Sequence, residues 1–388
     1  MGTCKLLIIL GLLSNVVALS TCCSKKVVEL PQQLIVEPMG ETILNPVVEA
    51  YMDEVSYDAD YSQTQILNYC SIQTEYRKDQ PKPIEIQSDY HSGTLLVSSD
   101  SAFAHIVREI NVLQKEDLFL YNLKPHEQYY WKLIQEDAEV DRGAFFISRD
   151  IRMCKINSLH NVRDLGGWKA GNGHVRYGIV YRGCEMDGLH GINITQDDID
   201  RMRNDLGVKA VLDFRRNNEY ASDRPVNEAG EIVSSLGEDV AYYYGNSYNI
   251  SSYSSTSSYN EYANCFRAVL ESVKNSRPIY CHCWGGNDRT GTFVFLLLGV
   301  LGVDESDLSK EYELSSFSYR TTENGSLPRR RDWGNQERGI LFREFVEALN
   351  NRFPGNNINE RIINYWFATG VKASEIEHLK KLMIEYEP

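Results

Sequence analysis

The sequence has a deficit of positive charge. Its 388 residues include 40 lysines and arginines against 54 aspartates and glutamates, which gives a formal net charge of -14 at pH 7. A field of this sign repels polyanions, so the composition argues against nucleic acid or an anionic membrane surface as a partner of the whole molecule. A local basic pocket for a small anion remains compatible with it.

The sequence also lacks the cysteine spacing of a metal site. It contains nine cysteines, but none forms a CxxC pair, and their scatter is not that of a disulfide framework. Beyond Cys4 and Cys22, which lie in or next to the first hydrophobic run, they are Cys23, Cys70, Cys154, Cys184, Cys265, Cys281 and Cys283. We therefore expect no zinc site, no other metal and no cofactor.

Long hydrophobic runs are scarce, and the one that stands out lies at the N-terminus. It covers residues 6–19 after a single lysine, is too short for a comfortable transmembrane helix and is typical of a secretory signal. The segment that follows, Leu19-Ser20-Thr21-Cys22, resembles a bacterial lipoprotein box. The alternative is ordinary signal cleavage, with Cys22 and Cys23 as bystanders.

These features predict a signal peptide over residues 1–22, a lipid anchor on Cys22 and a tether over residues 23–40. We expect an exported protein of a bacterial cell envelope, in the periplasm or at the cell surface. Its contact with the membrane would be made only through the lipid anchor.

Residues 41–150 contain short β-like runs separated by turn residues, such as GTLLVSSD and YYWKLIQED. This pattern is typical of an all-β sandwich of immunoglobulin-like size. The segment Leu123-x-Pro125-x-x-x-Tyr129 resembles the tyrosine corner of fibronectin type III-like domains, in which a buried tyrosine hydroxyl bonds to upstream backbone. The alternative is a generic tyrosine-rich strand.

Residues 151–388 alternate between strand-like and helix-like segments. Strand-like runs at 208–215, 240–245 and 277–283 are interleaved with helix-like runs, and further helices close the chain. This alternation predicts an α/β domain with a mainly parallel sheet and helices on both faces.

The stretch YCHCWGGNDRTG, residues 280–291, combines a strand end, a glycine-bearing loop and a helix start. Such a loop directs backbone N–H groups and the positive end of a helix dipole at one point, which is suited to an anion. Cys283 lies in this field, which favours a nucleophilic thiolate, and the fork of Arg289 can hold two phosphate oxygens. Gly285 and Gly286 let the loop curl. The alternative is a buried structural cysteine beside a core histidine.

The segment HCWGGNDRTG resembles the signature of cysteine-dependent phosphatases, and most of all the bacterial tyrosine/phosphoinositide phosphatase family, whose loop reads HCxxGKDRTG. The segments NVRDLGG (161–167), VRYGIVYRG (175–183) and LGVKAVLDFRRNNE (206–219) also resemble that family. The resemblance covers roughly residues 154–388. It implies a cysteine-phosphatase α/β fold and catalysis without a metal.

The resemblance also implies roles for individual residues. Cys283 would be the phosphocysteine nucleophile, Arg289 the phosphate-binding arginine, His282 the residue that helps to set the thiolate, and Thr290 the hydroxyl that assists the sulfur as it leaves. The residues expected to surround the substrate are Trp284, Gly285, Gly286, Asn287 and Gly291.

The general acid is open among three aspartates. Asp288 occupies the position of the family's loop aspartate. Asp213 and Asp239 are the alternatives, although the upstream loop at 242–255, where such an acid often lies, contains no carboxylate. Asp213 and Asp239 can each also be explained without a catalytic role, as a structural or surface carboxylate.

The sequence departs from the family pattern at two positions. Asn287 replaces the usual lysine of the loop, which removes one cation and disfavours substrates with several phosphates. Gly183 replaces a serine, for which the sequence offers no reason. The arginine-rich stretch 318–339 is an apparent insertion that forms either a basic lid or a solvated loop. In NVRDLGG we expect Arg163 and Asp164 to form a buried polar pair before a glycine turn.

The expected function is hydrolysis of phosphate monoesters through a phosphocysteine intermediate, with a phosphorylated protein or a small phosphoester as substrate. A protein-tyrosine phosphatase is the first interpretation. The alternatives are a phosphatase acting on inositol polyphosphates or phosphoinositides, and a catalytically idle lipoprotein that binds phosphate or glycan.

Overall fold

The computed structural model describes residues 40–54, 66, 69, 79–148, 151–188, 192–215, 224–245, 258–320, 329–330 and 337–386. The expected signal peptide, the lipid-anchor cysteine and nearly all of the expected tether lie outside these residues. Among the helices that are described, none is long and apolar enough to cross a membrane.

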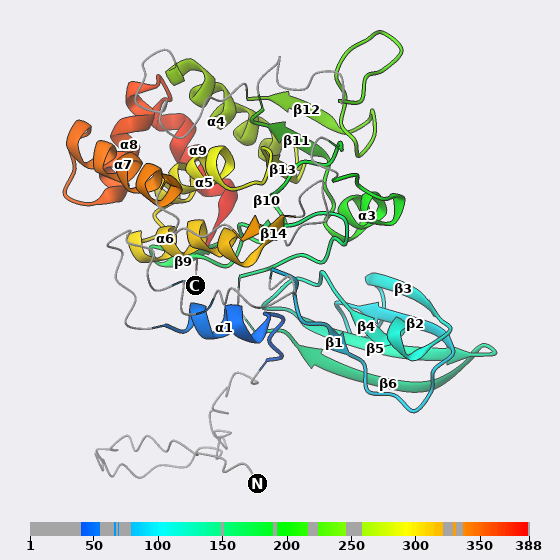
Figure 1. Cartoon of the computed structure of the whole chain (residues 1–388). Helices are drawn as coiled ribbons and strands as arrows, with labels where there is room; N and C mark the ends of the chain where they lie inside the picture. Colours follow the sequence, from blue (N-terminus) through cyan, green and yellow to red (C-terminus); the bar gives the residue numbers. More distant parts are fainter. Residues whose placement is uncertain are drawn as a thin grey trace, which may run out of the picture. The chain divides into compact units, whose positions relative to one another are not determined.

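The first part of the described chain is rich in antiparallel β-structure (Figure 1). A four-stranded sheet has the order β3-β2-β5-β6, and a separate pair joins β1 to β4. The strands are β1 (Ile84–Glu85), β2 (Gly93–Ser98), β3 (Ile106–Val112), β4 (Phe119–Leu120), β5 (Gln128–Gln135) and β6 (Ala138–Phe146), with a short helical turn, η1 (Lys115–Leu118), before β4. Alternate residues of β5 are buried, as expected for a strand with one face on a core. The expected all-β region is therefore present over residues 84–146.

Tyr129 in β5 has the hydrogen bonds that its sequence motif predicts. Its buried hydroxyl accepts from the Lys124 backbone N–H at 3.0 Å and donates to the Lys124 carbonyl at 3.2 Å. Burial raises the pKa of Tyr129 well above its usual value, so the hydroxyl keeps its proton. The local prediction is confirmed, while the fibronectin type III-like assignment of the whole region stays a prediction.

One segment inside the region expected to be all-β is helical. Helix α1 (Pro46–Met52) begins at Asn45, whose side chain accepts from the Val47 backbone N–H, with proline in the first helical turn. The Tyr51 hydroxyl donates to Glu313 at 2.5 Å, so α1 packs with the later part of the chain. Treating the whole of 41–150 as β-structure was wrong here, because an asparagine cap followed by proline is a helix-start signal.

A five-stranded sheet with the order β12-β11-β13-β10-β7 forms the centre of the second part (Figure 1). Its strands are β7 (Arg163–Asp164), β10 (Val180–Gly183), β11 (Ala210–Asp213), β12 (Ala241–Tyr244) and β13 (Ile279–His282). All neighbours run parallel except β7, which is antiparallel to β10. The predicted mainly parallel sheet is confirmed.

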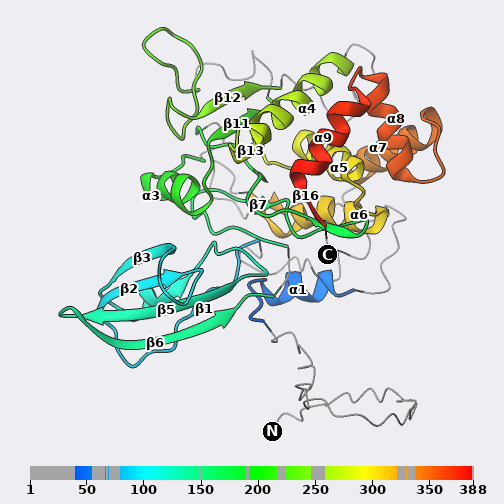
Figure 2. The ribbon, with the colours of Figure 1, turned by 180° about the vertical axis from the view of Figure 1, so that it is seen from behind.

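Helices cover both faces of this sheet (Figure 2). Neighbouring residues of β11 enter different apolar clusters, since Ala210 and Leu212 belong to one and Val211 to the other. The first cluster is built with α4, α5, α8 and α9, and the second with the segment around α3 and η2. The helical elements are α3 (Gln196–Asp200), η2 (Arg201–Asp205), α4 (Tyr259–Lys274), α5 (Asp288–Leu301), α6 (Glu305–Glu313), η6 (Leu314–Phe317), α7 (Glu337–Arg352), α8 (Ile358–Ala368) and α9 (Ala373–Met383).

Two small sheets complete the described elements. Strands β8 (Lys169–Ala170), β9 (Gly173–Val175) and β16 (Ile384–Tyr386) pair in the order β16-β9-β8. In the arginine-rich stretch, β14 (Tyr319–Arg320) pairs antiparallel with β15 (Arg329–Arg330). The residues between them and Arg331 lie outside the described residues, so the choice between a lid and a solvated loop stays a prediction.

The motif NVRDLGG folds differently from what we expected. Arg163 and Asp164 do not pair with each other, because consecutive residues of a strand point to opposite faces. Arg163 binds Glu311 at 2.8 Å, and Asp164 binds Arg152 at 3.1 Å. The expected glycine turn is present, since Gly167 has a φ of +94°.

Candidate active site

Cys283 lies at the carboxyl end of the central strand β13. Its neighbour His282 is in register with Gly183 of β10 on one side and with Asp213 of β11 on the other. Because these strands are parallel, the segments that follow them meet at one edge of the sheet, where ligands of open α/β sheets bind. Cys283 is 3% exposed and begins a loop that ends where α5 starts at Asp288.

Close packing leaves no room for a side chain at two positions, one in the loop and one in strand β10. Gly286 has a φ of +70°, and a Cβ there would collide with the Gly183 carbonyl. A Cβ on Gly183 would in turn collide with the Tyr280 hydroxyl, which donates to the Cys184 carbonyl at 2.7 Å. This supplies the reason for glycine in place of the family's serine at position 183: the Tyr280 hydroxyl occupies that space.

Two buried side chains hold the loop's carbonyl groups from behind. Asn161 donates to the Gly285 carbonyl at 3.1 Å, and Arg182 donates to the Gly286 carbonyl. In a trans peptide the C=O and the next N–H point in opposite directions. The N–H groups of Gly286 and Asn287 therefore point away from these supports, as an anion-binding loop requires.

The side chain of Asn287 has a structural contact that its sequence position did not suggest. Its side chain is 3% exposed and accepts from the Asn161 amide at 2.6 Å. We expected Asn287 among the substrate-binding residues and regarded it mainly as a lost cation. The amide oxygen ties the loop to Asn161, just before β7, so the side chain supports the loop, and substrate binding by Asn287 stays a prediction.

Arg289 and Thr290 occupy the first turn of α5, immediately after the loop. Arg289 is 8% exposed, and its Nη1 donates to the Phe214 carbonyl at a long 3.4 Å. The Thr290 hydroxyl is fully buried and has no hydrogen-bond partner within the described part of the chain. A buried hydroxyl without a partner is costly, and it is ready to donate to a group that arrives during a reaction.

His282 is buried beneath the loop and stacks on Tyr280, with ring centroids 5.7 Å apart. Burial lowers the pKa of His282, although the charge of Asp213 acts in the opposite direction. The Nδ1 atom lies 3.2 Å from the Cys283 carbonyl. A neutral ring with its proton on Nδ1 can donate to this carbonyl and fix the peptide that follows the cysteine.

Two of the three candidate acids are poorly suited to donate a proton. Asp213 is buried and accepts from Arg215 and, at 2.6 Å, from the Tyr242 hydroxyl. Burial opposes ionisation, but His282 and Arg215 outweigh it and hold the pKa of Asp213 far below its usual range. Asp213 is therefore ionised at neutral pH and has no proton to donate.

Asp239 lies before β12, at the end of the sheet opposite to the loop. Its side chain is 69% exposed and forms an ion pair with Arg203 at 2.7 Å. Asp288 is half-buried at the first position of α5. Of the three candidates, only Asp288 combines a position at the loop with partial exposure.

Trp284 and Gly291 bound the loop on its two sides. The Trp284 carbonyl accepts from the Glu185 backbone N–H at 3.0 Å, which joins the loop to the segment after β10. A Cβ on Gly291 would meet the Tyr312 ring at 2.7 Å. The missing side chain of Gly291 therefore allows α5 to pack against α6, and its expected place near the substrate stays a prediction.

Sequence reasoning missed Arg182 and Glu311, and it regarded Asn161 as scaffold. Arg182 and Asn161 lie in motifs that drew attention only through the family resemblance. The sequence did contain a signal for Arg182, because an arginine in an apolar strand such as IVYRG requires a buried partner of opposite charge or a hydrogen-bond acceptor. Nothing local in the sequence of α6 identifies Glu311 as that partner.

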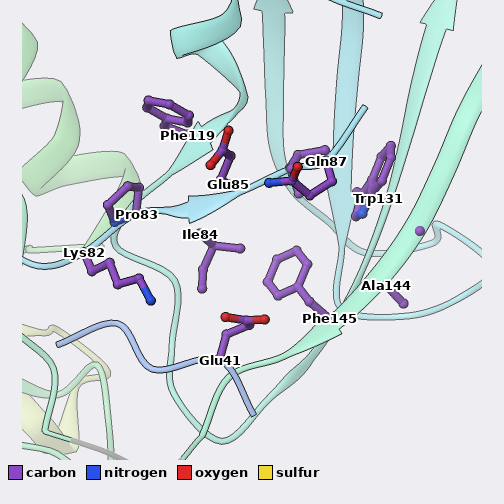
Figure 3. A pocket seen from close by; sticks show the side chains of 12 residues that line it. Glu41, Lys82, Pro83, Ile84, Glu85, Gln87, Phe119, Trp131, Ala144 and Phe145 are labelled. Carbon is purple, nitrogen blue, oxygen red and sulfur yellow. The ribbon is translucent and has the colours of Figure 1, made fainter. Parts of the chain in front are cut away.

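A cavity lies in the β-rich region, away from this loop. Its volume is about 510 Å³, and Ile84, Phe119, Trp131 and Phe145 are among its lining residues (Figure 3). Its lining includes none of the predicted catalytic residues. Within the described residues, no group of three or more His, Cys, Asp or Glu is arranged to hold a metal ion.

A parallel sheet with a cysteine-initiated loop and an arginine-bearing helix start at its carboxyl edge defines an α/β protein with a loop geometry suited to an anion. Comparison with known proteins then identifies the family. Residues 154–385, more than half of the chain, match the family model described as "Tyrosine phosphatase family", and the chain belongs to this family.

A protein of Cupriavidus necator named "Putative tyrosine-protein phosphatase" is 26% identical over 173 residues. The match covers 40% of this chain and 60% of that protein. The chain thus spans less than two thirds of the length of this relative.

Proposed function

We propose that this protein is a protein-tyrosine phosphatase that works through a phosphocysteine intermediate. The observation that carries the proposal is the position of Cys283 at the start of a loop whose carbonyls are held from behind and which ends at the N-terminus of α5. Membership of the tyrosine phosphatase family supports the same activity.

In the first chemical step, the Cys283 thiolate attacks phosphorus and the bond between phosphorus and the leaving oxygen breaks. Asp288 donates its proton to that oxygen, so the alcohol departs neutral. Arg289 and the loop N–H groups bind the equatorial oxygens of the transferring phosphoryl group.

In the second step, water attacks phosphorus and the bond between phosphorus and sulfur breaks. The Asp288 carboxylate takes the proton from the water. The buried Thr290 hydroxyl, which has no hydrogen-bond partner among the described residues, donates to the departing sulfur.

The depth of the loop favours an aromatic phosphoester. Cys283 is 3% exposed and Arg289 is 8% exposed. A phosphate on a tyrosine ring is carried farther from the peptide backbone than one on serine, so it reaches a recessed nucleophile more easily. The half-buried Trp284 offers an apolar surface to such a ring.

The test is hydrolysis of a phosphotyrosine peptide, with a phosphoserine peptide, a phosphoinositide and inositol hexakisphosphate as competitors. Cys283→Ser should reduce kcat on the order of 10³-fold or more. The matched control is Cys265→Ser, which changes a buried free thiol of α4. A Cys283→Ser variant as active as wild type would refute the nucleophile, and a preference for inositol hexakisphosphate would refute the substrate class.

We also propose that the protein is exported and anchored through Cys22, with the β-rich region as a fibronectin type III-like module ahead of the catalytic domain. The lipoprotein-box resemblance supports the anchor, and the Tyr129 hydrogen bonds support the module. Cys22→Ser should move the protein from the membrane fraction to the soluble fraction of the cell envelope. Retention at the membrane would contradict lipidation at this residue.

A further inference from the structure

We propose that Glu311 is a positioning residue for the phosphate loop, acting through Arg163 and Arg182. The proposal rests on the proposed phosphatase function and assigns a further part of the same site. The residues concerned are called the loop cluster: Asn161, Arg163, Arg182, Glu311 and Ser315.

Glu311 divides its carboxylate between two arginines from different strands. Its Oε1 accepts from Arg163 Nε of β7 at 2.8 Å, and its Oε2 accepts from Arg182 Nη1 of β10 at 2.8 Å. All three side chains are at most 1% exposed. Arg163 also donates to the Glu311 carbonyl at 2.8 Å, so α6 is joined to two strands through one residue.

Each arginine extends the connection from Glu311 to the loop. Arg182 donates from its other terminal nitrogen to the Gly286 carbonyl. Arg163 donates to the Asn161 side-chain oxygen, which leaves the amide of Asn161 to donate to the Gly285 carbonyl at 3.1 Å. Two chains of hydrogen bonds therefore run from one carboxylate to two successive loop carbonyls.

The hydrogen bonds of Arg163 and Arg182 involve charged groups, so they hold the loop carbonyls more rigidly than bonds between neutral groups would. Charge-assisted hydrogen bonds are shorter and about twice as strong as neutral bonds. A guanidinium bound at both ends has little freedom to rotate, and the carbonyl that it holds cannot turn inward. Loop N–H groups that are oriented before phosphate arrives spare the reaction the cost of reorganisation.

The other face of the same strand supplies a matched control. Asp164, the next residue of β7, forms a buried ion pair with Arg152 at 3.1 Å, with side chains 0% and 2% exposed. Its further bonds go to the backbone N–H groups of Gly166 and Gly178. This pair resembles the loop cluster in burial and charge, but within the described part of the chain its side-chain hydrogen bonds go to Asn122, Tyr181, Gly166 and Gly178 and not to the loop.

The experiment compares Glu311→Gln with Asp164→Asn in the full chain, with the thermal unfolding midpoint measured for both. We expect Glu311→Gln to lower kcat for a phosphotyrosine peptide about 100-fold and to weaken inhibition by inorganic vanadate at least tenfold. Asp164→Asn should keep kcat within about threefold of wild type, even if its thermal unfolding midpoint falls as far as that of Glu311→Gln. Equal kcat values for the two variants would overturn the proposal.

Rescue separates positioning from bulk stability. Arg182→Lys retains a cationic donor and should recover part of the kcat that Arg182→Met loses, whereas a purely structural role predicts that kcat follows the unfolding midpoint. If Glu311→Gln does not fold, Asn161→Gly serves in its place, because position 161 has a φ of +61° that glycine accepts. Unchanged kcat and vanadate inhibition in Asn161→Gly would also overturn the proposal.

A readout that does not need turnover keeps this inference distinct from the proposed function. The ratio of the rates at which iodoacetate and iodoacetamide alkylate Cys283 reports how strongly the loop attracts an anion. We expect this ratio to fall at least fivefold in Glu311→Gln and to be unchanged in Asp164→Asn. A wild type without turnover would refute the phosphatase function alone, whereas equal ratios in both variants would refute the positioning role.

Discussion

The two faces of strand β7 carry buried ion pairs of the same chemistry and different consequence. On one face Arg163 joins Glu311 and the phosphate loop. On the other face Asp164 joins Arg152, whose guanidinium donates to the Asn122 carbonyl in the β-rich region. Two consecutive residues of β7 therefore have different tasks. Arg163 supports the loop, and Asp164 holds the arginine that contacts the β-rich region.

The comparison teaches that burial and charge do not by themselves reveal what a residue does. Both clusters are almost completely inaccessible, and both contain arginine facing a carboxylate. What distinguishes them is the atom at the far end of the guanidinium: a loop carbonyl for Arg182 and the Asn122 carbonyl for Arg152. Substitutions in the loop cluster should therefore change mainly kcat, and substitutions in the Arg152–Asp164 pair should change mainly the free energy of unfolding.

The largest expected effect is on the Arg152 side. Arg152→Leu leaves the buried Asp164 carboxylate without its cation, which should lower the free energy of unfolding by about 3–5 kcal/mol. The measurement is urea denaturation, with kcat determined on the folded fraction. Adding Asp164→Asn should restore part of the stability, because the uncompensated charge is gone. A large loss of kcat at unchanged stability would remove the distinction between the two faces.

The second effect concerns Asp288 at the loop, where a substitution should lower kcat and leave stability almost unchanged. Asp288→Asn should lower kcat for a phosphotyrosine peptide about 100-fold, as expected for loss of a general acid. Stability should change by less than about 0.5 kcal/mol, since Asp288 is half-buried in the first turn of a helix. The loss should be smaller for a substrate with a very acidic leaving group, which needs no proton. Equal losses for both substrates would argue against Asp288 as the acid.

The third effect concerns the close packing of Gly183 of β10 against Tyr280 of β13. Gly183→Ser places a side chain against the Tyr280 hydroxyl and should cost about 1–3 kcal/mol of stability through overpacking. The matched control is the double variant with Tyr280→Phe, which removes the obstructing hydroxyl and should recover part of the loss in urea denaturation. A single variant as stable as wild type would show that the Tyr280 hydroxyl does not exclude a side chain at position 183.

The smallest effect concerns Asp307. Unlike Glu311 and Asp164, this carboxylate has no buried arginine beside it among the described residues. Burial and the nearby charge of Asp304 raise the pKa of Asp307 to about 6, although Lys310 acts in the opposite direction. The folded state therefore holds this proton more tightly than the unfolded state, so lowering the pH from 7 to 4 stabilises the protein at this residue.

Asp307→Asn should accordingly be about 1 kcal/mol more stable than wild type at pH 7, a figure reduced for partial solvent screening. The two proteins should be equally stable near pH 4, where Asp307 is protonated. Denaturation curves at both pH values provide the measurement. A variant that is less stable than wild type at pH 7 would contradict the sign of the argument.

Much of the fold could be predicted from local pattern. The β-like runs of residues 84–146 and the strand and helix alternation that follows are short-range signals, and both parts formed as expected. Helix α1 was missed because seven helical residues lie among strand-like segments, and their cap at Asn45 was overlooked. The Arg163–Asp164 pairing was wrong because the motif was interpreted as adjacent charges and not as a strand with two faces.

The sequence by itself determined which reactive groups the loop carries, since Cys283, Asp288, Arg289 and Thr290 lie within eight residues between a strand end and a helix start. Only the tertiary structure decided what supports them. Glu311 lies 148 positions from Arg163 along the chain and 129 from Arg182. Such a contact arises from how helices pack against a sheet, because a buried charge takes the partner that the fold brings within reach, and no local pattern specifies that partner.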